Sequence, residues 1–102
     1  AYARGVQLLQ KRKYAKALYI LNDYNDRNTV VAHLSLDHNE RAMELLATMP
    51  KDAVTEYLRA IACSRLGRKA EGREHFLEAC RLDGRMEYRG NLDPEIAELL
   101  KQ

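Results

Sequence analysis

Residues that interrupt regular structure are scarce in this sequence, which holds two prolines and five glycines among its 102 residues. Proline and interior glycine destabilise helices, so their scarcity permits long regular elements. Leu, Ala, Glu, Lys and Arg are abundant instead, and these are strong helix formers. Apolar residues make up 46% of the chain and charged residues 31%, a balance typical of one small globular domain and not of a disordered chain.

A long apolar run is also missing. No apolar stretch approaches the roughly 18 residues that a membrane-spanning helix needs, so we expect no membrane insertion. The chain opens on Ala1, without a methionine, in a stretch that already reads as helix. We therefore expect the sequence to be a piece of a larger protein.

An excess of one charge is absent as well. Seventeen basic and 15 acidic residues give a net charge of +2, and the two signs are interspersed. Nucleic-acid-binding proteins usually show a clear basic surplus, so nucleic acid is a disfavoured partner. Basic side chains do gather around one predicted turn, at Arg65, Arg68, Lys69 and Arg73. An RNA-binding repeat is thus an alternative, although nearby glutamates favour a solvated, charge-balanced helix face.

The few cysteines and histidines show no metal-ligand spacing. Cys63 and Cys80 each lie on an apolar helix face, which predicts buried free thiols; a disulfide between facing helices is the alternative. A predicted helix end separates His33 from His38, and His75 belongs to another hairpin. No local spacing supports a catalytic triad or a phosphate-binding loop. The sequence therefore predicts no catalytic residues, no cofactor and no metal, hence no enzyme.

Apolar periodicity and helix-end signals predict an all-α chain. Helices are expected at about residues 1–11, 14–24, 29–36, 40–49, 52–66, 69–82 and 93–101, with residues 85–90 irregular. Asp52 and Asp93 are predicted N-caps, Pro94 the first residue of the last helix, and Gly67 a left-handed C-terminal cap. No sustained two-residue alternation predicts a strand.

An internal repeat organises these helices into hairpins at about residues 1–25, 28–50 and 52–83. Early in the second helix of each hairpin stands a small residue: Ala17, Ala42 and Gly72. Four positions later stands a larger apolar residue: Leu21, Leu46 and Phe76. A further inward position is expected three residues beyond, at Tyr24, Met49 and Ala79.

This pattern resembles the tetratricopeptide repeat family. The family's small residue in the first helix matches Gly5 and Ala60, its turn glycine matches Gly67, and its aromatic residue matches Tyr14. Residues 57–83 carry the resemblance best; the other hairpins are degenerate, and the spacings of 25 and 30 residues between the small positions fall short of the usual repeat of about 34. The resemblance implies an α–α superhelix of three stacked antiparallel hairpins with a capping helix at 93–101, forming a single domain over residues 1–102.

In this family the first helices of the hairpins line a concave groove. The corresponding positions here are Tyr2, Val6, Leu9, Arg27, Val31, Leu34, Tyr57, Ile61, Ser64 and Arg65. The resemblance implies a non-catalytic interaction or scaffold module that binds a protein or peptide in this apolar groove. Alternatively, these side chains pack within the stack or against neighbouring repeats, and the chain is a structural segment that self-associates.

The last residues bear on location. The segment GNLDPEIAELLK at residues 90–101 resembles the tails of repeat proteins in Gram-negative cell envelopes. This favours the bacterial periplasm or cell envelope, with the cytoplasm as the alternative.

Overall fold

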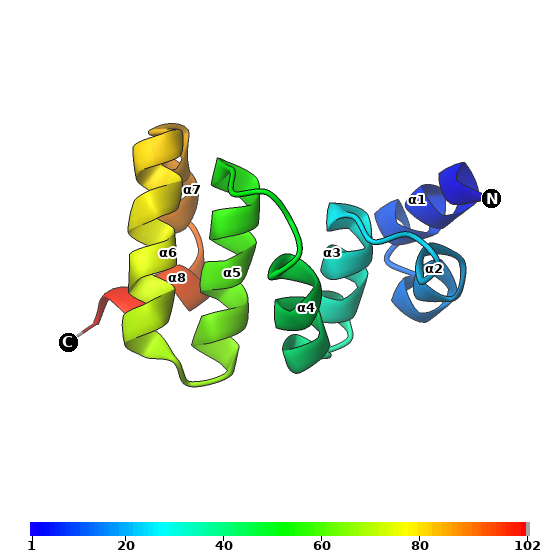
Figure 1. Cartoon of the computed structure of the whole chain (residues 1–102), viewed down its shortest axis with the longest axis horizontal. Coiled ribbons are helices and arrows are strands. Elements are labelled where there is room, and N and C mark those ends of the chain that lie inside the picture. The colour runs from blue at the N-terminus through cyan, green and yellow to red at the C-terminus, as the bar shows by residue number, and fades with distance from the viewer. Residues whose placement is uncertain (102) are drawn as a thin grey trace. The chain divides into compact units, whose positions relative to one another are not determined.

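The computed structural model describes residues 1–101, and every regular element in that range is a helix (Figure 1). The prediction of an all-α fold is thereby confirmed. The helices are α1 (Tyr2–Gln10), α2 (Tyr14–Leu21), α3 (Arg27–Ser35), α4 (Asn39–Leu46), α5 (Ala53–Arg65), α6 (Lys69–Leu82), α7 (Arg85–Asn91) and α8 (Pro94–Leu100). They form two compact units, an N-terminal unit of Ala1–Thr48 with α1–α4 and a C-terminal unit of Met49–Gln102 with α5–α8.

The same turn closes the hairpins α1–α2, α3–α4 and α5–α6. Its middle residue is left-handed each time, with φ of 61° at Arg12, 60° at Asp37 and 76° at Gly67. The next backbone N–H donates to the carbonyl five residues back, from Lys13 to Leu8, from His38 to His33 and from Arg68 to Cys63, at 2.8–2.9 Å. This is the Schellman geometry, which satisfies carbonyls that a helix end leaves unpaired.

The small positions of the repeat are buried, as the pattern predicts. Ala17 and Ala42 are fully buried, and Gly72 lies so close to α5 that an added Cβ would be 3.1 Å from the Cβ of Cys63. The larger residues four positions later, Leu21, Leu46 and Phe76, are also buried. Small side chains at these positions let the paired helices approach closely.

The third repeat position is buried only in the last hairpin, at Ala79. Helices predicted to run to Tyr24 and Met49 end three residues earlier, at Leu21 and Leu46. Tyr24 is therefore exposed and Met49 half-buried. After α2 the backbone turns so that the Thr29 hydroxyl donates to the carbonyl of Leu21 at 2.9 Å, a tertiary bond that helical periodicity does not reveal.

Helix α3 begins two residues earlier than the sequence predicts. Asp26 is its N-cap, and its carboxylate accepts the backbone N–H of Thr29 at 3.1 Å. The predicted caps of the C-terminal unit are confirmed: Asp52 forms a capping box with Thr55, and Asp93 accepts the N–H of Glu95.

Helix α8 closes the core of the C-terminal unit, as expected of a final amphipathic helix. Its Ile96 and Leu99 are fully buried against Phe76 and the other core residues, which are Tyr57, Ala60, Ile61, Ala79 and Met86. Figure 1 shows α5 and α6 side by side, with α8 against both of them.

The expectation that residues 85–90 are irregular was wrong, because they lie in α7. The buried residues of this helix are Met86 and Gly90. Gly90 permits close contact with the core, since a Cβ there would come within 2.4 Å of the Phe76 ring. A helix that buries one methionine and one glycine shows no apolar period, so its sequence gives no helical signal.

Candidate functional site

Six of the ten predicted groove residues lie on α1 and α3 of the N-terminal unit. Tyr2, Val6 and Leu9 share one face of α1 at helical spacing and are half-buried. They pack against a small core of Leu8, Ala17 and Leu21. On α3 the corresponding residues differ in exposure, because Arg27 is exposed, Val31 half-buried and Leu34 only 5% exposed.

Polar contacts of Tyr2 join the start of α1 to the start of α3. Its hydroxyl donates to Asp26 at 2.5 Å and accepts from the Asn28 side-chain amide at 2.7 Å. The bond to the Asp26 carboxylate raises the pKa of Tyr2. The Tyr24 ring lies edge-on to Tyr2, with 4.8 Å between ring centroids. These contacts hold the starts of α1 and α3 together, so the predicted groove residues of these two helices lie on neighbouring elements.

A hollow of about 670 Å³ opens elsewhere on the N-terminal unit, and none of its lining residues belongs to the predicted groove. Its lining residues are Ala15, Leu18, Tyr19, Asn22, Asp23, His33, Leu36 and His38. Tyr19 is 87% exposed there, the largest exposure among the large apolar side chains described. In the sequence, a tyrosine at a surface position of an amphipathic helix is only a weak indication of a binding site. The structure adds the evidence, because it shows Tyr19 exposed beside apolar neighbours.

The other four predicted groove residues, which lie on α5, contact the chain itself. Tyr57 and Ile61 are buried in the core of the C-terminal unit. The Tyr57 hydroxyl donates to Asp93 at 2.7 Å, the Arg89 guanidinium lies 4.4 Å from its ring centroid, and burial raises its pKa. These side chains pack within the molecule, as the alternative interpretation of the groove expected.

Ser64 and Arg65 also contact α8. The Ser64 hydroxyl donates to the backbone carbonyl of Glu95 at 3.3 Å, and Arg65 forms an ion pair with the Glu95 carboxylate at 2.7 Å. Tyr57, Ser64 and Arg65 therefore contact residues of the α7–α8 segment, and Ile61 packs in the same core.

Two of the four basic residues that raised the RNA-binding alternative have acidic partners: Arg65 pairs with Glu95, and Lys69 lies 3.8 Å from Glu98. A third, Arg73, donates to the backbone carbonyl of Leu99 at 3.1 Å. Such pairs suit a solvated, charge-balanced face.

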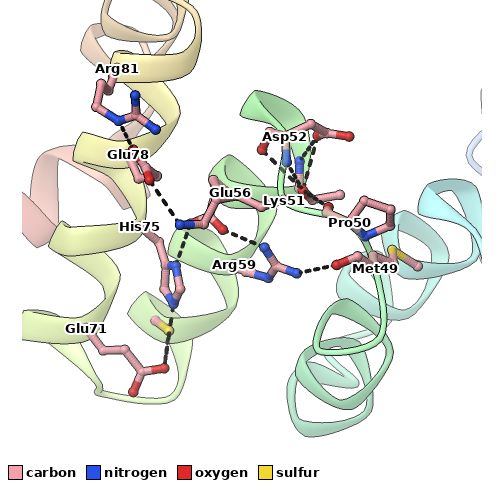
Figure 2. A network of polar contacts seen from close by, with 12 residues as sticks. Met49, Pro50, Lys51, Asp52, Glu56, Arg59, Glu71, His75, Glu78 and Arg81 are labelled. Carbon is pink, nitrogen blue, oxygen red and sulfur yellow. Dashed lines mark hydrogen bonds and ion pairs between the residues drawn. The ribbon is translucent and has the colours of Figure 1, made fainter.

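A polar network crosses from α5 to α6 (Figure 2). At its centre is Glu56, a carboxylate that is only 2% exposed. It forms an ion pair with Arg59 at 2.5 Å, and it lies 2.6 Å from Nδ1 of His75. Arg59 also donates to the backbone carbonyl of Met49 at 3.0 Å. A carboxylate that pairs with a guanidinium accepts hydrogen bonds, so we assign Nδ1 of His75 as the donor in this contact.

The opposite nitrogen of the same imidazole faces a carboxylate and a thiol. Nε2 of His75 lies 3.7 Å from the Glu71 carboxylate, and the Cys63 thiol lies 3.6 Å from the same oxygen. Ligand atoms of Cys63, Glu71 and His75 all lie within 4.8 Å of one another. Cysteine, glutamate and histidine are side chains that hold metal ions in proteins.

Nucleophilic chemistry at Cys63 is disfavoured. The side chain is fully buried, and burial together with the neighbouring Glu71 carboxylate raises its pKa to about 11. Burial also raises the pKa of Cys80, and both cysteines are free thiols. Reactive cysteines need a thiolate near neutral pH, which electropositive surroundings provide.

The sequence contained a signal for this cluster that the linear spacing of cysteines and histidines misses. Cys63 and Glu71 stand four residues before and four after Gly67, so the hairpin turn places them opposite each other. Glu71 and His75 are four apart on α6 and share one face. The equal spacing of Cys63 and Glu71 from the turn, and not the spacing between histidines, therefore indicates that Cys63, Glu71 and His75 lie together.

Comparisons with known proteins give no relative: no family model, curated protein or solved structure matches the chain. Within residues 1–101, no helix combines the length and apolar character needed to cross a membrane.

Proposed function

We propose that this chain is a non-catalytic interaction module that binds a protein or peptide through apolar side chains on its N-terminal unit. The observation that carries the proposal is the 87% exposure of Tyr19 on a hollow that Leu18 and Leu36 also line. Exposed aromatic residues beside apolar neighbours are typical of protein-binding surfaces. Tyrosine supplies a large contact area together with a hydroxyl that forms hydrogen bonds.

The tetratricopeptide resemblance supports the same class of function. Three hairpins closed by the same left-handed turn favour degenerate repeats of one kind, and we propose that they belong to an α–α superhelix. On this view Val6, Leu9 and Val31 form a second surface for the same role. The α5 residues take no part on this proposal, since Tyr57 and Ile61 pack in the core and Ser64 and Arg65 bond to Glu95.

A peptide display selection on the purified chain tests the proposal. We expect enriched peptides with apolar side chains that bind with micromolar affinity in calorimetry. Tyr19→Ser should weaken binding about tenfold or more, as loss of an aromatic anchor does. Tyr88→Ser is the matched control, because Tyr88 is an exposed tyrosine (62%) on the C-terminal unit.

Val31→Asp separates the two surfaces of the N-terminal unit. If it abolishes binding while Tyr19→Ser has no effect, the peptide occupies the α1–α3 face and not the hollow. A selection in which the wild-type chain and a Tyr19→Ser, Val31→Asp double variant enrich the same peptides equally would contradict binding at either place.

Self-association is a second candidate, which exposed apolar side chains on α7 and at its C-cap favour. Tyr88 is 62% and Leu92 72% exposed, and both line an open hollow together with Gly84, Glu87 and Asn91. Light scattering at several protein concentrations tests it. We expect a concentration-dependent mass that Leu92→Ser lowers; a strict monomer at all concentrations would exclude this candidate.

A further inference from the structure

We propose that Cys63, Glu71 and His75 bind one zinc ion between α5 and α6. This site goes beyond the proposed interaction role and stands independently of it. The three side chains offer one sulfur, one oxygen and one nitrogen ligand, all of which zinc accepts. Three protein ligands leave a fourth tetrahedral position for water or for a ligand from outside.

The distances suit a tetrahedral ion. Zinc lies about 2.3 Å from sulfur, about 2.0 Å from nitrogen and about 2.1 Å from oxygen, which puts ligand atoms about 3.4–3.6 Å apart. The Cys63 sulfur lies 3.6 Å and the His75 nitrogen 3.7 Å from the Glu71 carboxylate. The remaining pair lies within 4.8 Å, so an ion that draws the two ligand atoms together shortens their separation by about 1.3 Å at most.

The buried Glu56 is a second, independent observation that points to an ion. Its carboxylate fixes the proton of His75 on Nδ1, which leaves the lone pair of neutral His75 on Nε2, toward Cys63 and Glu71. Figure 2 shows His75 between Glu56 on one side and Glu71 on the other. A carboxylate that orients a histidine through its far nitrogen is the usual outer shell of zinc sites.

The helical hairpin holds the ligands in place before an ion arrives. The Arg68 N–H donates to the Cys63 carbonyl at 2.9 Å, so the turn is anchored at a ligand residue. Beside the cluster, Gly72 keeps α5 and α6 close together. A preformed site lowers the conformational entropy that binding must overcome.

Charge and access are also suitable. A zinc ion with the Cys63 thiolate, the Glu71 carboxylate and neutral His75 has no net charge, so burying it requires no further counter-ion. The ion displaces the thiol proton, which passes to solvent. Glu71 is exposed and His75 half-buried, so the ion enters from the solvent side while Cys63 binds it from within.

A protonated His75 bridging Glu56 and Glu71 without any metal is the competing explanation. Titration of the metal-free chain with Co²⁺ and Zn²⁺ separates the two. We expect one ion per chain, a tetrahedral cobalt spectrum and a thiolate-to-cobalt absorption band. Zinc should raise the melting temperature of the wild-type chain.

Variants assign the ligands. Cys63→Ala should remove the thiolate band, and His75→Gln, at a half-buried position, should weaken binding without unfolding the chain. Cys80→Ala is the matched control, because Cys80 is a free thiol outside the cluster, and it should leave binding unchanged. Glu56→Gln should lower affinity about 10- to 100-fold, as loss of an orienting partner does.

Circular dichroism of each metal-free variant establishes that it is folded. A thiolate band that persists in Cys63→Ala but disappears in Cys80→Ala would overturn the assignment. So would a wild-type chain that binds zinc no more tightly than the Cys63→Ala, His75→Gln double variant, since His75 would then serve only as an ion-pair partner of the glutamates.

Discussion

At the scale of single residues, His33 is a titratable group whose surroundings oppose its charged form. It is 5% exposed, and its Nδ1 lies 3.1 Å from Nδ1 of His38, so one imidazole donates to the other. Burial lowers the pKa of His33, and the positive charges of His38 and Arg41 lower it further. The folded N-terminal unit therefore contains neutral His33 at pH values where the unfolded chain is already protonated.

We expect the N-terminal unit to lose stability as the pH falls below about 6.5, the usual histidine pKa. Below that value the unfolded state binds a proton that the folded state does not bind. The free energy of unfolding therefore decreases as the pH decreases, until the pH reaches the lowered pKa of His33 in the folded state. The slope for one proton is at most about 1.4 kcal/mol per pH unit. Hydrogen exchange of the α3 amides at pH 7.5 and 5.5 measures it.

His33→Gln should reduce this pH dependence, because glutamine does not titrate. His38→Gln is the control: it removes the neighbouring ring but leaves the buried imidazole, so most of the dependence should remain. An unchanged pH dependence in His33→Gln would assign the effect to another group.

At the scale of elements, the three repeats share the same hairpin turn. The residues at its left-handed position differ in how well they tolerate that conformation. The left-handed position holds Gly67 in one turn but Arg12 in another. In this left-handed conformation a residue with a Cβ lowers the stability of the fold by about 1 kcal/mol or more, whereas glycine adopts it without that steric cost.

We therefore expect Gly67→Ala to destabilise the chain by about 1 kcal/mol and Arg12→Gly to be neutral or stabilising by several tenths of a kcal/mol. The gain is smaller than the loss, because glycine also adds entropy to the unfolded chain. Lys13→Gly is the control at the next residue, where φ is −93°, and it should destabilise. Urea unfolding followed by circular dichroism measures all three; a loss of stability in Arg12→Gly equal to that in Lys13→Gly would contradict the argument.

The elements also show what the sequence could predict. Periodicity, caps and the repeat located the hairpins, because each of these signals lies within a few neighbouring residues. The ends of α2 and the existence of α7 depend on contacts between distant residues, such as Thr29 with the Leu21 carbonyl and Gly90 with Phe76. The resemblance to the repeat family predicted that Tyr57 lines a groove, yet Tyr57 packs in the core that α8 closes. Neither this packing nor the hollow at Tyr19 can be predicted from the spacing of neighbouring residues in the sequence.

At the scale of the whole molecule, the two units differ in how much structure each supports from its own residues. In the N-terminal unit the helices have eight or nine residues; Leu8, Ala17 and Leu21 form a cluster between α1 and α2, and Val30, Leu34 and Leu46 are buried on α3 and α4. In the C-terminal unit, α5 and α6 have 13 and 14 residues, and α8 completes the core. Short isolated helices are marginal in water, and most helical stability comes from packing.

We expect residues 49–102 to fold on their own and residues 1–48 to be largely unfolded when separated. The C-terminal fragment should unfold cooperatively in urea, with helical circular dichroism close to its share of the full chain. A helical, cooperatively unfolding 1–48 fragment beside a disordered 49–102 fragment would reverse the assignment of stability.

A pair of leucines in α8 tests whether the separate C-terminal fragment has the packing described here. Leu99 is fully buried and its neighbour Leu100 is 43% exposed. Leu99→Ala should destabilise the fragment by about 2–5 kcal/mol through loss of buried area and the cavity left behind, whereas Leu100→Ala should change it by less than about 1 kcal/mol. Equal effects of the two substitutions would mean that α8 does not close the core of the isolated fragment.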